Sequence, residues 1–251
     1  MMKKSLIVLL VMMLLAAVPV FAEENTAIVS FSDTGLEQET EGVSFDNGVV
    51  RIEKPGTYVL SGTLTNGQIF VSVKDKGDVI LVLSGVDIHS NESAAIEVEK
   101  CGKQAVISLA EGTENIISDG PQPNADPDED PSAVLFSAAD LVIEGNGSLQ
   151  VTGGRVDGIT SKDRLIIRGG KIVVEAVRHG IKGKDSVQIA GGEIEINAGK
   201  DGIKSTNKEK SSLGYVEIIG GRITIRSGDE PIQAETYYTI ENAKVRIIVN
   251  E

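Results

Sequence analysis

The strongest constraint on the fold is a repeat of about 22 residues in the C-terminal half of the 251-residue chain. Pairs of small residues recur there at intervals of 24, 22, 29 and 22 residues, namely Gly145, Gly169-Gly170, Gly191-Gly192, Gly220-Gly221 and Asn242-Ala243. A near-constant period is typical of solenoids, in which each repeat packs against its two neighbours.

Each repeat contains three short segments with the apolar alternation of a half-buried strand. One segment follows each small-residue pair (148–151, 171–174, 193–196, 222–225 and 244–247), one precedes it (141–143, 165–167, 187–189, 216–218 and 238–240), and the third is centred on Ile159, Ile181, Ile203 or Ile232. Three strands per coil predict an all-β parallel β-helix whose coils stack about 4.8 Å apart. A β-sandwich also has short strands, but its turns seldom keep so constant a period.

The N-terminal half has the same short alternating apolar segments at less regular intervals, namely 56–62, 68–73, 78–88, 94–98 and 105–109. We therefore expect one β-helix domain over residues 23–251. An acidic loop at 119–131 contains four prolines, which exclude regular structure there. A polar insertion at 205–215 explains the 29-residue step and is expected at a corner of one coil.

Residues 1–22 have the pattern of an export signal: Lys3 and Lys4, an apolar run from Leu6 to Val18, and a small-residue cleavage site ending at Ala22. The run is too short for a stable membrane span. We expect a secreted protein, extracellular or at the cell surface, with no membrane partner. A net charge of −13 argues against nucleic acid as a partner, and the single Cys101 excludes an intrachain disulfide.

Aligning the coils places Asp157, His179, Asp201 and Glu230 in one corner column, with Asp229 beside the last. Carboxylates at a tight turn, beside backbone carbonyls, suit calcium, which takes oxygen ligands. The metal candidates are therefore Asp157, Asp201, Asp229 and Glu230. Aspartate before glycine is also a common turn residue, so both interpretations stay open.

The same alignment predicts a basic stripe on one outer face, made by Lys162, Arg178, His179, Lys182, Lys184 and Lys204. Residues 23–150 hold 6 basic and 23 acidic side chains, whereas residues 151–251 hold 16 and 14. The stripe is a candidate binding site for a polyanionic ligand. The alternative is a solubilising surface paired with Asp163 and Asp185.

Aromatic side chains are scarce, and the chain has no Trp. Tyr215, Tyr237 and Tyr238 lie near the corner insertion and form a candidate platform, although the position of Tyr238 predicts a core residue. Binding of a neutral sugar polymer usually needs flat aromatic surfaces. The composition therefore favours an acidic ligand over a neutral one.

Several stretches of the chain resemble a known family: GTYVLSGTLTNGQIFVSV (56–73), LVLSGVDIHSNESAAIEV (81–98), ISLAEGTENIISDG (107–120), HGIKG (179–183), DGIKS (201–205) and GRITIRSGDEPIQAET (221–236). In this order they resemble secreted carbohydrate-binding-domain proteins with a right-handed, pectate-lyase-like β-helix. The resemblance implies a calcium-containing protein that binds plant-wall polysaccharides, including cellulose and polygalacturonate, without an established catalytic activity.

Two other functions stay open from the residues alone. A calcium-dependent polysaccharide lyase needs a base and a cation, and Arg178 or Lys204 beside Asp201 are candidates for that chemistry. A surface or matrix scaffold would instead use the terminal strand 244–250 to pair with another chain, because open strand edges invite such pairing. We expect a monomer or a weak oligomer.

Overall fold

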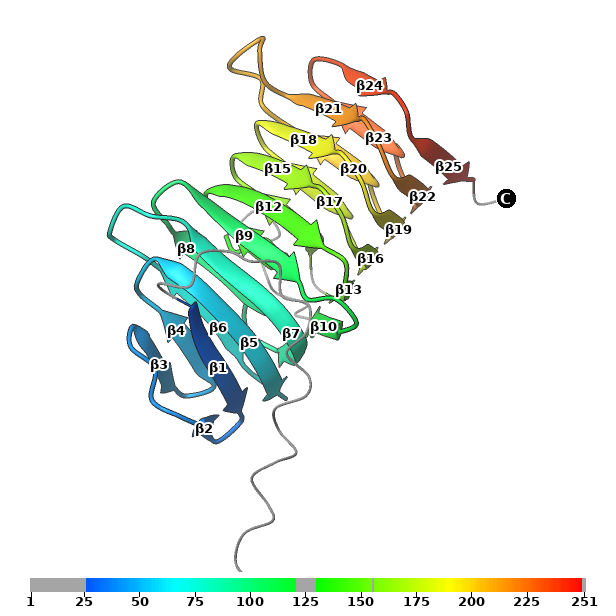
Figure 1. Cartoon of the computed structure of the whole chain (residues 1–251). Helices are drawn as coiled ribbons and strands as arrows, with labels where there is room; N and C mark the ends of the chain where they lie inside the picture. Colours follow the sequence, from blue (N-terminus) through cyan, green and yellow to red (C-terminus); the bar gives the residue numbers. More distant parts are fainter. Residues whose placement is uncertain (1–25, 121–129, 155, 250–251) are drawn as a thin grey trace, which may run out of the picture.

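The computed structural model describes residues 26–120, 130–154 and 156–249, and these form 25 strands and no helix (Figure 1). The strands wind into a parallel β-helix, so the predicted fold class is confirmed, and every segment expected to be a strand contains one, with ends that differ by at most two residues. The handedness, which the resemblance implies, stays a prediction. The export signal and residues 121–129 of the acidic loop lie outside the described residues.

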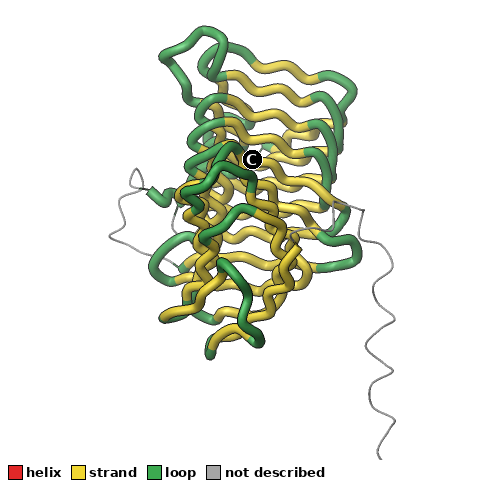
Figure 2. The backbone as a smooth tube through the Cα atoms, turned by 60° about the vertical axis from the view of Figure 1, so that its left-hand side comes forward, coloured by secondary structure: helices red, strands yellow, loops and turns green. Residues whose placement is uncertain are grey.

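Each regular coil contributes one strand to each of three parallel stacks, which Figure 2 shows as successive rungs. Stack 1 contains β9 (Gln104–Leu109), β12 (Asp140–Gly145), β15 (Arg164–Ile167), β18 (Ser186–Ile189), β21 (Tyr215–Ile218) and β24 (Tyr238–Ile240). Stack 2 contains β10 (Glu114–Asp119), β13 (Ser148–Gly153), β16 (Lys171–Ala176), β19 (Glu193–Ala198), β22 (Arg222–Ser227) and β25 (Lys244–Ile248).

Stack 3 faces away from the other two and carries the predicted basic stripe. It contains β4 (Val49–Ile52), β6 (Gln68–Ser72), β8 (Ile96–Lys100), β11 (Ala133–Ser137), β14 (Asp157–Ser161), β17 (Ile181–Gly183), β20 (Ile203–Ser205) and β23 (Ile232–Ala234).

The N-terminal coils differ from the regular ones. The long strands β5 (Gly56–Leu64) and β7 (Val79–Ser90) run across stacks 1 and 2 and join them: β7 pairs with β9 through its first residues and with β10 through its last. Two antiparallel pairs close this end of the β-helix. They are β1 (Thr26–Ser32) with β2 (Gly35–Leu36), and β3 (Val43–Asp46) with β4.

Columns of β-branched and leucine side chains fill the interior. In stack 2 the parallel register aligns Ile172, Ile194 and Ile223, all buried, while the intervening residues face outward. Such alternation is what one apolar and one polar sheet face require. The buried cluster is continuous from Val29 to Ile225.

The small-residue pairs are tight turns between stacks 1 and 2. Gly192 and Gly221 have φ angles of +96° and +89°, and a Cβ on either would lie 2.9 or 2.8 Å from a backbone oxygen of the previous coil. Only glycine fits this close approach without strain. The corner insertion occupies residues 206–214, between β20 and β21, and is the orange loop in Figure 1.

The last described coil leaves inward-facing side chains exposed. Tyr238 occupies the same inward column as buried Val216, as predicted, but it is exposed, so the prediction that it is a core residue was wrong. The reason is that no strand of the described residues follows β24 in stack 1. The described part of the chain contains no helix long and apolar enough to cross a membrane.

Candidate functional site

A column of polar side chains, the corner ladder, runs along one corner of the C-terminal coils through Asp157, His179, Asp201 and Glu230. Oδ1 of Asp157 accepts the backbone N–H of His179 at 3.1 Å, and Nδ1 of His179 accepts that of Asp201 at 3.3 Å. Oδ1 of Asp201 then accepts the backbone N–H of Glu230 at 3.1 Å. Asp157, His179 and Asp201 are buried, and each fastens the corner of the next coil.

Lys182 and Lys204 lie next to each other on the outer face of stack 3, because β17 and β20 pair in register at these residues. Nζ of Lys182 lies 3.3 Å from Oδ2 of Asp157, and Nζ of Lys204 lies 2.6 Å from Oδ2 of Asp201. Both lysine side chains are 23% exposed. The buried carboxylates thus hold two ammonium groups at the surface of one face.

The other predicted basic residues surround this pair. Nε of Arg178 lies 4.0 Å from Oδ1 of Asp157. The backbone N–H of Lys162 and that of Lys184 bind the chain one coil earlier, which places both lysines in the column beside Lys182. Lys162 pairs with Asp130 at 2.9 Å, whereas Lys184 is exposed. The four predicted lysines are therefore gathered on the outer face of stack 3, while Arg178 lies at the corner beside Asp157 and His179 is buried in the corner ladder and not exposed on the predicted stripe.

Burial lowers the pKa of the His179 imidazole from 6.5 to about 4; Lys204 and Lys182 act in the same direction, and Asp157 and Asp201 oppose them. His179 is therefore neutral at pH 7, in agreement with its role as a hydrogen-bond acceptor. Burial raises the pKa of the Asp201 carboxyl, but hydrogen bonds from Lys204 and from the Glu230 backbone outweigh it, so this pKa lies below its usual value. Asp201 is a carboxylate at neutral pH.

The calcium that the family resemblance implies can be compared with these contacts. A calcium ion takes about six to eight oxygen ligands. At Asp157 and Asp201, one carboxylate oxygen faces an ammonium group and the other accepts a backbone N–H, so this arrangement does not fit a resident cation. Asp229 and Glu230 are exposed instead, and the described residues contain no group of three or more His, Cys, Asp or Glu that could share a metal ion. Calcium binding stays a prediction.

Two polar residues that the sequence did not single out extend the Lys182–Lys204 column. Thr160 precedes Lys182 in the register and Gln233 follows Lys204. Oε1 of Gln233 is buried without a hydrogen-bond partner in the described part of the chain. The sequence did contain the signal that places Thr160 and Gln233 in this column, because each residue directly follows the repeated isoleucine of its coil, Ile159 or Ile232.

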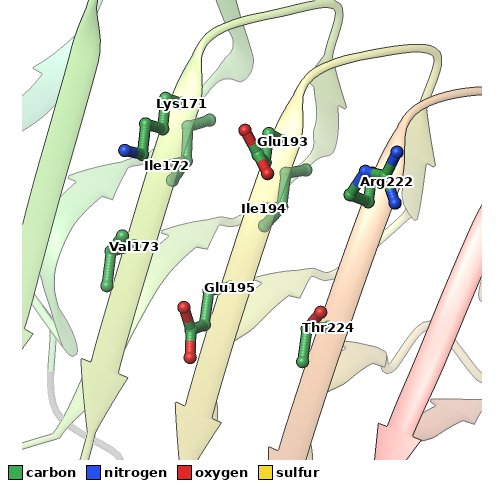
Figure 3. A pocket seen from close by; sticks show the side chains of 8 residues that line it. All are labelled: Lys171, Ile172, Val173, Glu193, Ile194, Glu195, Arg222 and Thr224. Carbon is green, nitrogen blue, oxygen red and sulfur yellow. The ribbon is translucent and has the colours of Figure 1, made fainter.

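A shallow groove of mixed charge lies on the outer face of stack 2, a different face of the β-helix from the basic stripe. Figure 3 shows Lys171, Glu193 and Arg222 in one row across β16, β19 and β22, with Glu195 in the next row. Glu195 pairs with Arg226 at 3.2 Å. The positive and negative side chains of this groove alternate and neutralise one another, so this face offers no basic surface comparable with stack 3.

The fold and the polar outer face of stack 3 define a β-helical protein with an extended polar surface. Comparison with known proteins agrees with this class of protein. A family model described as carbohydrate-binding domain-containing protein matches residues 46–251, so the chain belongs to this family. A relative from Acetivibrio thermocellus with the same description is 40% identical over 154 residues. That match covers 61% of this chain and 54% of the relative, so the chain spans about half the length of that protein.

A solved structure has the same fold. It is described as the polysaccharide lyase-like protein from C. thermocellum, a gadolinium derivative, and is 35% identical with a TM-score of 0.77. The match covers 90% of this chain and 96% of the other. The comparison agrees with the β-helix of the described residues.

Proposed function

We propose that this protein binds acidic plant-wall polysaccharide, of the polygalacturonate kind, on the outer face of stack 3 and does not cleave it. The observation that carries the proposal is the register that sets Lys182 beside Lys204, with Lys162 and Lys184 in the neighbouring column. Membership of a carbohydrate-binding family supports it.

The repeat of the coils suits a repeating ligand. Neighbouring strands lie about 4.8 Å apart, so cations at equivalent positions form a row along the β-helix axis. Asp157 and Asp201 each hold one lysine head, which restricts its rotamers before the ligand arrives. An ammonium group has three donors, so each lysine keeps donors for a sugar carboxylate.

Isothermal titration with trigalacturonate tests this site. We expect the double change Lys182→Gln and Lys204→Gln to raise the Kd about tenfold or more, because two charge-assisted hydrogen bonds become neutral. Glutamine can still donate to Asp157 and Asp201, so the buried carboxylates keep a partner. Lys171→Gln on stack 2 is the matched control. No binding by the unaltered protein, or an unchanged Kd in the double variant, would sink the proposal.

Calcium assistance is part of the proposal and is tested by the same titration in calcium and in excess chelator. The exposed carboxylates of Glu230, at the end of the corner ladder, and of Asp229 beside it are the predicted metal residues left without a lysine in the described contacts. An equal Kd in both buffers would remove calcium from the proposal and leave the lysine site intact.

A secreted location is also proposed, from the export pattern of residues 1–22. Mass spectrometry of the protein exported by an expressing host should find a chain that begins at Glu23. Retention of residues 1–22 in a cell-bound product would contradict it.

The likeness to a polysaccharide lyase-like protein keeps a lyase as the second candidate. Lyase chemistry needs a group that removes the proton next to a uronate carboxylate. The two candidates for that chemistry are both held by buried carboxylates, Arg178 at 4.0 Å from Asp157 and Lys204 at 2.6 Å from Asp201, which favours binding over catalysis. Incubation with polygalacturonate and calcium should give no absorbance from an unsaturated product; a steady increase that scales with protein would establish the lyase.

A further inference from the structure

A stacked tyrosine pair lies on stack 1, a different face from the basic stripe. Tyr215 begins β21, and Tyr237 directly precedes β24 in the next coil, where its carbonyl accepts the backbone N–H of Val216 at 3.1 Å. The two rings are parallel within 4° and their centroids are 5.3 Å apart. Tyr237 is nevertheless 46% exposed.

Polar side chains in the adjacent column hold this pair in place. The hydroxyl of Tyr237 donates to Oε1 of Glu217 at 3.2 Å, and Nε2 of Gln188 donates to Oε2 of Glu217 at 3.1 Å. The parallel register sets Gln188, Glu217 and Thr239 in one outward-facing row. The aromatic surface is therefore oriented before any ligand binds, which lowers the entropy lost on association.

One face of the Tyr237 ring packs on Tyr215, and the other has no further coil beyond it, since β24 is the last strand of stack 1 in the described residues. Exposed aromatic rings with polar neighbours are typical of recognition surfaces. We propose that Tyr237, supported by Tyr215 and flanked by Glu217 and Thr239, binds a neutral sugar unit. The C–H face of the sugar stacks on the ring, and its hydroxyls exchange hydrogen bonds with the two flanking side chains.

The charges at this position select a neutral ligand. Glu217 brings a carboxylate to the rim of the ring, which repels a uronate. Arg164, two coils earlier in the column of Tyr215, is engaged by the carboxylate of Asp140 through both Nε and Nη2. This site therefore goes beyond the proposed function, which concerns an acidic polymer and the lysines of stack 3.

NMR titration of the full chain with cellopentaose, xylopentaose and mannopentaose, each alone, tests the site. We expect at least one of them to shift the ring signals of Tyr215 and Tyr237. Tyr237→Ala should raise its Kd about tenfold or more, which corresponds to about 1.4 kcal/mol, while Tyr237→Phe, which keeps the ring, should change it less than about threefold. Tyr238→Ala, at the exposed tyrosine outside the stacked pair, is the matched control and should leave the Kd unchanged.

The result is separable from the test of the basic stripe. Trigalacturonate binding should be the same in Tyr237→Ala and in the unaltered protein, and neutral sugar binding should be the same in the Lys182→Gln and Lys204→Gln variant. The proposal is overturned if none of the three sugars shifts the tyrosine signals, or if Tyr237→Ala binds as well as the unaltered protein.

Discussion

The two halves of the β-helix fasten their coils with different buried polar groups. In the N-terminal half, Oδ1 of Asn115 accepts the backbone N–H groups of Gly85 and Val86 at 2.9 and 3.1 Å, and its Nδ2 donates to the carbonyl of Ser148 at 3.0 Å. In the C-terminal half, the corner ladder does the same work with Asp157, His179 and Asp201. An amide does not titrate, whereas the ladder does, so the stability that the corner ladder contributes should depend on pH and that contributed by Asn115 should not.

The two ends differ as well. Antiparallel pairs cover the N-terminal end, whereas β23, β24 and β25 each pair with the preceding coil alone within the described residues. Inward-facing side chains are consequently buried in the middle coils and half-buried or exposed in the last one. The same residue type should therefore contribute very different stability at the two positions.

The largest effect should come from comparing Ile194→Ala with Ile247→Ala in stack 2. Ile194 is 1% exposed and Ile247 is 49% exposed, although both face inward. We expect Ile194→Ala to lower the free energy of unfolding by about 2–5 kcal/mol, because it leaves a cavity, and Ile247→Ala by under about 1 kcal/mol. Urea unfolding measures both. Equal losses would mean that the last coil is covered in solution.

The second prediction concerns pH. The folded pKa of His179, about 4, lies below its unfolded value of 6.5, so the unfolded chain takes up the proton first as pH falls. The stability from neutral His179 is complete above about pH 6.5 and is lost as pH falls toward 4, a change of about 3 kcal/mol at 1.36 kcal/mol per pKa unit. The pKa of Asp201 is also lowered by folding, so its carboxylate adds a further loss of stability once the pH falls below the ordinary pKa of an aspartate.

Urea unfolding at pH 7.5 and pH 4.5 measures this loss. In His179→Asn, the amide oxygen can still accept the N–H of Asp201 but does not titrate, so the variant should lose much less stability between these two pH values. An identical loss in the variant and the unaltered protein would place the pH response elsewhere in the molecule.

The fold was largely predictable from the sequence, because inward-facing residues, turn glycines and strand spacing repeat together at Ile159, Ile181 and Ile203. The N-terminal coils were predictable as strands but not in their arrangement. The strands β5 and β7 each run through both stack 1 and stack 2, and their pairing contains a register shift near Gly62. No local sequence pattern predicts this shift. The exposure of Tyr238 was missed for a related reason. The periodicity predicts that its side chain faces inward, but burial also depends on whether another coil packs over it.

The site was predictable as a set of residues but not as a set of contacts. Spacing alone placed Asp157, His179 and Asp201 in one column, and it placed Lys182 beside Lys204. Spacing could not show that the lysines reach the buried carboxylates, since this depends on side-chain rotamers. That contact makes the two aspartates anchors for the lysines, and metal binding by them stays a prediction.

The third prediction tests the fastening of the N-terminal half. Asn115→Ala removes an acceptor shared by two backbone N–H groups, so it should cost about 1–3 kcal/mol of unfolding free energy. The loss should be the same at pH 7.5 and pH 4.5, because no titrating group of this contact is removed. A loss that grows at low pH would contradict the proposed difference between the two halves.

The smallest effect concerns the open end. Free strand edges and exposed Ile240 and Ile247 should give weak, concentration-dependent self-association, which sedimentation velocity detects as a rising mean sedimentation coefficient. Ile247→Lys should abolish it, because a charge would have to be desolvated in the contact. Ile28→Lys, at an exposed isoleucine of β1 beside the covered end, is the matched control and should leave it unchanged. Association that survives Ile247→Lys and disappears in Ile28→Lys would move the self-associating surface to the N-terminal end, and with it the exposed edge on which a scaffold function depends.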